Sequence, residues 1–326
     1  MSTMPPRLRA LAAASVAALA LSALSACDED GDGAGSEPAA SGTPTPPGSP
    51  SAPSSAPSSA PSTSPAVLDR GAAPRRLLRI GVEKGHVEHA TLTLTTTQSS
   101  TLRGTERFAG EMRIPMTLQV TSTVTDVTDD ELSVETVFGP TTVDRTGIAR
   151  SLAGPIEQAL TFLEGATMTT VVRPDGTTVS RDVDLGDDGP DLVGPVLDDV
   201  LAQGFAIVRF PVEEVGLGAR WRTTDEVEIG GASVRVDSTY EVVGLSDEGY
   251  TLDVRTEQTT APGGPYAGGT IVEGSSTSRG RIEVREGMFL PVRSSSTIRG
   301  TTVVDVGDAR VTTRLTTEVR IATEAR

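Results

Sequence analysis

The sequence predicts a mainly β fold with minor α content. We expect a long antiparallel sheet, or sheets, made from two related β units, with two short amphipathic helices packed on the sheet. Three observations support this prediction. Apolar residues recur at every second position in long threonine- and valine-rich runs, turn motifs separate such runs, and two other stretches show helical spacing. Residues 1–76 differ from this pattern in composition.

Residues 1–26 have the features of a secretory signal peptide. Arg7 and Arg9 precede an alanine- and leucine-rich run that extends from Ala10 to Leu24. This run is shorter than the ~20 residues that a membrane-spanning helix needs, and it ends in small residues that a peptidase accepts. We therefore expect the segment to be removed.

The signal sequence ends in Leu24, Ser25 and Ala26, followed by Cys27, the only cysteine in the chain. This tetrapeptide resembles the lipobox of bacterial lipoproteins. The resemblance implies cleavage before Cys27 and modification of its thiol with a diacylglyceryl group that carries acyl chains such as palmitate, so that Cys27 is a lipid anchor. The expected location is the extracytoplasmic face of the cell membrane, with the membrane as a partner through this anchor. The alternative is an ordinary signal peptide with a chance cysteine near its end.

Residues 27–76 are expected to form a lipidated, disordered tether. An acidic stretch, Asp28–Asp32, is followed by a tract of serine, proline and alanine. Such a composition cannot bury enough apolar surface to fold. We expect the tether to hold the folded domain away from the bilayer.

The overall charge is strongly acidic, with 28 basic and 44 acidic residues and a formal net charge of −16. A surface of this kind does not attract nucleic acid or anionic lipid headgroups, so we expect no nucleic acid partner. The acidity is interpreted as an aid to solubility, with contact to divalent cations as the alternative. Because aromatic residues make up only 3% of the chain, a carbohydrate-binding protein or glycosidase is disfavoured.

The first β unit is expected over residues 77–210. Met112, Ile114, Met116, Leu118 and Val120 occupy alternate positions, as expected for a strand with one buried face. The motif Pro174-Asp175-Gly176 predicts a hairpin. The two helices are expected at 148–163 and 191–203. Their apolar positions are Ile148, Leu152, Ile156, Leu160 and Leu163 in the first, and Leu192, Val196, Leu197, Val200 and Leu201 in the second.

The second β unit is expected over residues 211–326. Its turns are predicted at 247–249 and 285–287, and alternation continues at Val311, Leu315, Val319 and Ile321. Residues 236–243 repeat the pattern of residues 120–127, and an acidic turn follows each. These repeats indicate an internal duplication, although chance similarity between threonine-rich strands is the alternative.

Two segments of the folded part resemble an uncharacterised family of secreted bacterial lipoproteins. One is Leu77–Ile80 followed by Glu83–Gly85, and the other runs from Phe210 to Trp221. Within the second, Pro211, Gly216, Gly218 and Trp221 form a turn motif that we expect to lay the tryptophan on the sheet. The architecture is also distantly similar to the lipid carriers LolA and LppX/LprG, which by itself does not indicate function.

No catalytic constellation is recognisable, so we expect no enzyme, no cofactor and no metal site. His86 and His89 are the only histidines, and their spacing on a strand places them on opposite faces. Asp182, Asp184, Asp187, Asp188 and Asp191 crowd one loop, which we interpret as solvated, with cation binding as the alternative.

The expected function is a non-enzymatic binding or scaffold module of the cell envelope, anchored by lipid at Cys27. Its partner would be an envelope protein or an apolar ligand. The alternative is a carrier of lipid or another apolar ligand, held in a cavity between the sheet and the helices.

Overall fold

The computed structural model describes residues 64–103, 111–144, 146, 148, 160–161, 163–184, 207–229, 231–266, 269–307 and 309–325. The expected signal peptide, the lipobox residues Leu24, Ser25, Ala26 and Cys27, and most of the tether lie outside the described residues. Within the described part, no helical segment is long and apolar enough to cross a bilayer.

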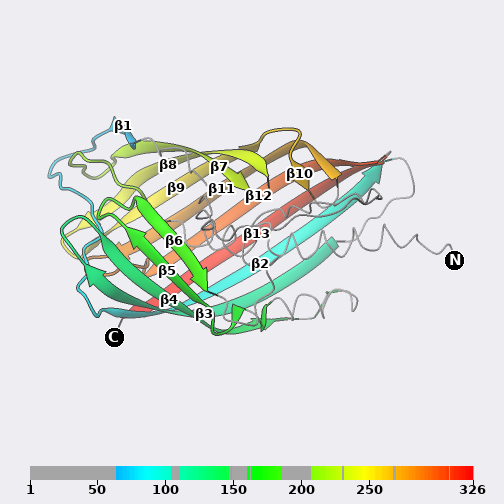
Figure 1. Ribbon diagram of the computed structural model, residues 1–326. Helices are drawn as coiled ribbons and strands as arrows, with labels where there is room; N and C mark the ends of the chain where they lie inside the picture. Colours follow the sequence, from blue (N-terminus) through cyan, green and yellow to red (C-terminus); the bar gives the residue numbers. More distant parts are fainter. Residues whose placement is uncertain are drawn as a thin grey trace, which may run out of the picture.

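The described residues form one antiparallel sheet of thirteen strands (Figure 1). The strands are β1 Ala66–Asp69, β2 Val87–Arg103, β3 Glu111–Val127, β4 Leu132–Val143, β5 Thr167–Val172, β6 Thr178–Asp184, β7 Arg220–Ile229, β8 Ala232–Ser246, β9 Gly249–Thr260, β10 Pro265–Tyr266, β11 Gly269–Arg285, β12 Arg293–Val306 and β13 Ala309–Ala325. The order across the sheet is β1-β7-β8-β9-β11-β12-β13-β2-β3-β4-β5-β6, and β10 pairs with β11.

Strands from residues 77–210 and strands from residues 211–326 belong to this single sheet. Strands β2 to β6 follow one another on one side, and β7 to β13 follow one another on the other. The last strand, β13, pairs with β2 along its length, from Arg310 opposite Arg103 to Ala325 opposite Glu88. This long pairing joins the C-terminal strand to the start of the first unit, so the chain forms one sheet.

The three predicted hairpin turns are confirmed. Residues 174–176 lie between β5 and β6, residues 247 and 248 lie between β8 and β9, which begins at Gly249, and residues 286 and 287 begin the connection from β11, which ends at Arg285, to β12. Strand β1 falls in the range expected to be tether, and it pairs with β7 at the sheet edge. The ordered chain therefore includes residues on the N-terminal side of Leu77.

The prediction of two helices packed on the sheet is wrong for the described residues. These contain no helix element, and helical conformation occurs among them only at residues 160, 161 and 163. Gly165, whose φ is 89°, turns the chain out of this single helical turn and into β5. The second expected helix, at 191–203, lies outside the described residues.

The sheet covers its own core, which is the physical reason that helices are not needed there. It curls so that β3, β4 and β5 lie across from β7, β8 and β9 (Figure 1). One apolar cluster contains residues from both sides and from the two segments between them: Leu78, Ile80, Val82, Val124, Leu132, Val134, Val172, Phe210, Val215, Ala219, Trp221, Val242, Tyr250 and Leu252. A second cluster, around Phe138 and Leu118, continues it along the first unit.

The inner face of the sheet also carries polar side chains. Hydroxyl and amide side chains form hydrogen bonds across neighbouring strands there: Thr96 with Thr317, Ser100 with Thr313, Ser122 with Thr136, Ser238 with Thr256, and Ser276 with Gln258. Thr317 is fully buried. The strands approach closely on this face: a Cβ added at Gly280 would lie 2.7 Å from the Ser295 carbonyl oxygen.

Candidate functional site

The predicted turn motif lies at one end of the sheet, against the main core. Trp221 on β7 is fully buried, stacks on Tyr240 at 5.3 Å between ring centroids, and donates its indole N–H to the carbonyl oxygen of Arg209 at 2.9 Å. Gly216 approaches the backbone so closely that a Cβ there would lie 1.8 Å from the Ala72 carbonyl oxygen. Burial raises the pKa of the Tyr240 hydroxyl. These contacts give the motif a packing role.

The two histidines contact different side chains. His86 Nε2 lies 3.0 Å from Glu88 Oε1, and His89 Nδ1 lies 3.0 Å from Thr121 Oγ1. Of the acidic loop, Asp182 and Asp184 lie on β6, and Asp187, Asp188 and Asp191 lie outside the described residues. No group of three or more histidine, cysteine or acidic side chains that could hold a metal occurs in the described ranges.

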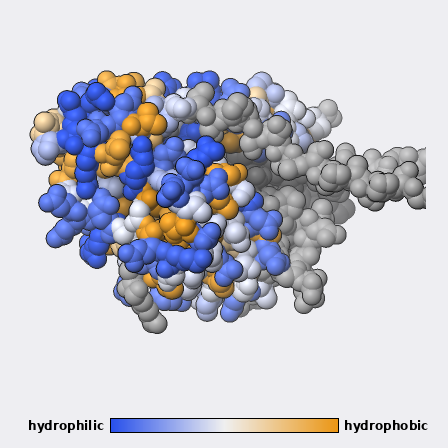
Figure 2. All heavy atoms as spheres, turned by 60° about the vertical axis from the view of Figure 1, so that its left-hand side comes forward, coloured by the Kyte–Doolittle hydropathy of each residue, from blue (hydrophilic) through white to orange (hydrophobic). Residues whose placement is uncertain are grey.

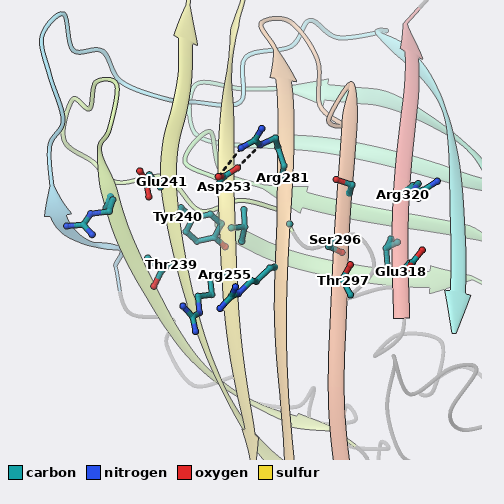
Figure 3. Close-up of a pocket in the computed structure, with 16 residues that line it drawn as sticks. Thr239, Tyr240, Glu241, Asp253, Arg255, Arg281, Ser296, Thr297, Glu318 and Arg320 are labelled. Atoms are coloured by element: carbon teal, nitrogen blue, oxygen red, sulfur yellow. Dashed lines mark hydrogen bonds and ion pairs between the residues drawn. The ribbon is translucent and has the colours of Figure 1, made fainter. Parts of the chain in front are cut away.

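A hollow of about 690 Å³ lies on the outer face of the sheet, over β7, β8, β9, β11, β12 and β13 (Figure 3). Five arginines and three carboxylates line it: Arg220, Arg255, Arg279, Arg281 and Arg320, with Glu241, Asp253 and Glu318. This balance is positive, although the chain as a whole carries a net charge of −16. The hollow is therefore a locally basic region on an acidic protein.

The sheet register places two of these arginines directly opposite each other. Arg255 on β9 pairs in register with Arg279 on β11. Side chains at such positions have Cβ atoms ~4.5–5.5 Å apart, and like charges directly opposite each other destabilise a sheet. Neutral hydroxyls flank the pair in the same row, because Thr239 lies opposite Arg255 and Thr297 lies opposite Arg279.

The two arginines keep most of their donors free. Arg255 Nε lies 3.5 Å from Glu257 Oε1, a long contact that leaves its terminal nitrogens available. The guanidinium group of Arg279 forms no hydrogen bond or ion pair with any residue in the described part of the chain. A guanidinium group presents five N–H donors in a planar fork, so this pair offers an unfilled set of donors to an anion.

The neighbouring row of the hollow is neutralised internally. Arg281 donates two hydrogen bonds to the Asp253 carboxylate, at 2.6 and 3.0 Å, and both residues are partly exposed (Figure 3). The Asp253 carboxylate raises the pKa of Arg281. This ion pair forms one wall of the hollow, next to the Arg255 and Arg279 row.

A second hollow of about 500 Å³ adjoins the first and shares Arg281, Ser295 and Arg320 with it. It continues over β2, β12 and β13 and adds Arg293 and Glu283. Arginine and threonine side chains of this kind hold phosphate, sulfate or carboxylate groups by charge-assisted hydrogen bonds.

Sequence reasoning missed this site. A signal was present in the period-two spacing of charged residues, since Arg279, Arg281, Glu283 and Arg285 alternate along β11 and therefore share one face. The sequence alone gives no register between β9 and β11. For that reason the opposition of Arg255 and Arg279 appears only in the folded sheet.

Comparison with known proteins identifies no family. No family model matches the sequence, so this comparison does not support the resemblance to a family of secreted lipoproteins, and no curated protein matches it. Among solved structures, an outer membrane channel from Pseudomonas putida F1 is similar at 8% sequence identity, covering 74% of this chain and 97% of that one, with a TM-score of 0.24. A likeness at that TM-score carries no conclusion about function.

Proposed function

We propose that this chain is a lipid-anchored binding module of the cell envelope that holds an anionic group in the outer-face hollow. The observation that carries the proposal is the pairing of Arg255 opposite Arg279, with threonine hydroxyls on both sides. The ligand group is a phosphate, sulfate or carboxylate. The role is binding, and the ligand is met on the outer face of the sheet.

An anion bound between the Arg255 and Arg279 guanidinium groups offsets the electrostatic repulsion between them. Charge-assisted hydrogen bonds from arginine to oxyanions are about twice as strong as neutral ones. The planar guanidinium group can also donate two parallel hydrogen bonds to the same oxyanion. Thr239 and Thr297 can donate further hydrogen bonds along the same row. The hollow is open to solvent, so we expect moderate affinity that weakens with salt.

The lipid anchor belongs to the proposal and is supported by the sequence, through the lipobox-like tetrapeptide that ends in Cys27. Two acyl chains suffice to hold a protein stably on a bilayer. Mass spectrometry of the mature N-terminal peptide tests this part directly.

The concave face offers less support for the carrier alternative. Its apolar residues in β3 to β5 and β7 to β9 pack against each other in one cluster. Further along, hydroxyls that pair across strands, such as Thr96 with Thr317, lie on this face among apolar residues such as Leu315 and Val319. The hydroxyls make these positions less favourable for an acyl chain than a wholly apolar face would be.

The test is titration of the mature chain with two polymeric anions, linear polyphosphate and polygalacturonate, followed by calorimetry at low and moderate salt. The informative variant is Arg255→Ala with Arg279→Ala. The matched control is Arg299→Ala with Arg314→Ala, because these two exposed arginines lie on the same outer face, outside the hollow, and change the net charge equally.

We expect the Arg255 and Arg279 variant to weaken binding at least tenfold more than the control variant, which corresponds to about 1.4 kcal/mol. Equal weakening in both variants would mean that only diffuse charge attracts the polymer, and the proposed site would be rejected. Failure of the unmodified chain to bind either polymer would reject the anion-binding function itself.

A further inference from the structure

The most exposed large hydrophobic side chains gather at one end of the molecule. Among the described residues, the four highest exposed fractions belong to Val212 at 65%, Leu68 at 57%, Leu217 at 51% and Leu77 at 48%. This end contains β1 and lies at the left in Figure 1. Figure 2, which brings that side forward, shows hydrophobic patches among the hydrophilic ones.

These four residues lie on two segments that run side by side. The amide of Ala72 donates to the carbonyl oxygen of Leu217 at 2.8 Å, and the amide of Gly216 donates to that of Arg70 at 2.9 Å. Further along, Arg76 and Val215 exchange two backbone hydrogen bonds. We call the surface formed by residues 68–79 and 211–218 the apolar end.

The apolar end is held firmly from beneath, so its exposed side chains are displayed on a fixed frame. Leu78 and Val215 lie in the main core, while Leu77 and Leu217 on the same two segments are about half exposed. The guanidinium of Arg79 donates to the carbonyl oxygen of Pro211 at 2.9 Å and so ties the two segments together.

The apolar end is weakly positive in an acidic chain. Residues 68–79 contain four arginines and one aspartate, and residues 211–218 add Glu213 and Glu214, so the apolar end has a formal charge of +1, whereas the whole chain has −16. Arg70 and Arg75 are exposed, and Arg75 uses only two of its donors, both on the carbonyl oxygen of Gly71. At physiological salt the Debye length is about 8 Å, so local charge outweighs the distant negative residues for a surface in contact.

The chain also enters the described part at this end. Residues 64 and 65 lead directly into β1, which carries Leu68, and the segment before them is the expected tether from Cys27. Any bilayer that the N-terminal segment is attached to is therefore connected to the domain at its apolar end.

We propose that the apolar end docks on a phospholipid bilayer that contains anionic lipid. Leu68, Leu77, Val212 and Leu217 enter the boundary between headgroups and acyl chains, and Arg70 and Arg75 contact the phosphates. This contact is separate from the anion-binding hollow and needs no acyl group. It seats the sheet with β1 and the 211–218 segment toward the membrane.

The experiment uses the mature chain, residues 27–326, with Cys27→Ser so that no acyl group is present. Its flotation is measured with vesicles of phosphatidylcholine alone and of an equimolar mixture of phosphatidylcholine and phosphatidylglycerol. The test variant is Leu68→Ser with Leu217→Ser. The matched control is Val179→Ser with Val227→Ser, whose side chains are 46% and 41% exposed on β6 and β7. Fluorescence of the buried Trp221 checks that each variant is folded.

We expect the unmodified Cys27→Ser chain to float with the mixed vesicles and to bind phosphatidylcholine alone more weakly. Removing two exposed leucines should lower partitioning by on the order of tenfold, given the area that each contributes to the contact. The control variant should bind as the unmodified chain does. Absence of vesicle binding, or equal losses in test and control variants, would overturn the docking surface while leaving the anion-binding hollow unaffected.

Discussion

Replacing Glu88 with alanine should be among the most destabilising single changes in this protein. The Glu88 side chain on β2 is 1% exposed, and its carboxylate accepts the backbone N–H groups of Phe289 at 2.6 Å and Leu290 at 2.8 Å. His86 Nε2 lies 3.0 Å from the same carboxylate. Glu88 thus joins β2 to the loop between β11 and β12, across more than 200 residues of chain.

The magnitude follows from the two donors that lose their acceptor. A buried N–H without a partner costs about 1–3 kcal/mol, so the two together cost about 2–6 kcal/mol, and we expect about 4 kcal/mol. Domains of this kind have total stabilities of about 5–15 kcal/mol. For a chain of this size the loss corresponds to a fall in Tm of roughly 8–16 °C.

The assay is urea unfolding of the Glu88→Ala variant, followed by Trp221 fluorescence and circular dichroism. Glu88→Gln should show an intermediate loss, because its carbonyl oxygen can accept one N–H while its amide group faces the other. Glu324→Ala removes an exposed glutamate from the adjacent strand β13 and should change stability by no more than about 0.5 kcal/mol. If Glu88→Ala lowers stability by no more than this control, the carboxylate does not hold the loop and the reasoning fails.

Two further predictions concern pH and backbone packing. The Thr224 hydroxyl, with Arg235 and Arg222, lowers the pKa of Asp237 from its ordinary 3.8 to about 2, so its stabilisation is present above pH 4 and lost as the pH falls toward 2. In urea unfolding between pH 2 and 6, Asp237→Asn should be less stable than the unmodified chain above pH 4, and this difference should vanish near pH 2. A stability difference between the two chains that stays constant from pH 2 to 6 would contradict this prediction. Gly216→Ala should cost about 2 kcal/mol, since its Cβ would lie 1.8 Å from the Ala72 carbonyl oxygen, whereas Gly81→Ala meets nothing within 4 Å. Equal Tm values for Gly216→Ala and Gly81→Ala would show that the backbone at Ala72 moves away from residue 216 without a loss of stability.

The strands could be predicted from the sequence because their signals are local. Alternation at Met112, Ile114 and Met116 and the turn at 174–176 depend only on neighbouring residues, and β3 and the β5–β6 hairpin follow from them. The pairing of β13 with β2 depends on contacts about 200 residues apart. Periodicity does not specify such a pairing, so the choice between one sheet and two lobes was open.

The inner face of β13 marks another limit of pattern reading. Val311, Leu315 and Val319 point inward, as their spacing indicates, but Thr313 and Thr317 point inward as well and are buried. Their hydroxyls are satisfied by Ser100 and Thr96 on β2. A buried polar residue is tolerated when its partner lies across the strand, and the partner is known only once the register is known.

The candidate binding site could not be predicted for a related reason. Net charge is a sum over the whole chain, whereas a ligand contacts only one part of the surface. The value of −16 led us to expect no attraction for nucleic acid or anionic lipid headgroups, yet β11 alternates its charges so that Arg279 and Arg281 share the outer face. Pairing with β9 then gives these arginines different surroundings. Arg281 meets Asp253 and is neutralised, while Arg279 meets Arg255 and is not. A shift of two residues in this register would place Arg279 opposite Asp253 and remove the unfilled pair, so the anion-binding hollow depends on strand register more than on composition.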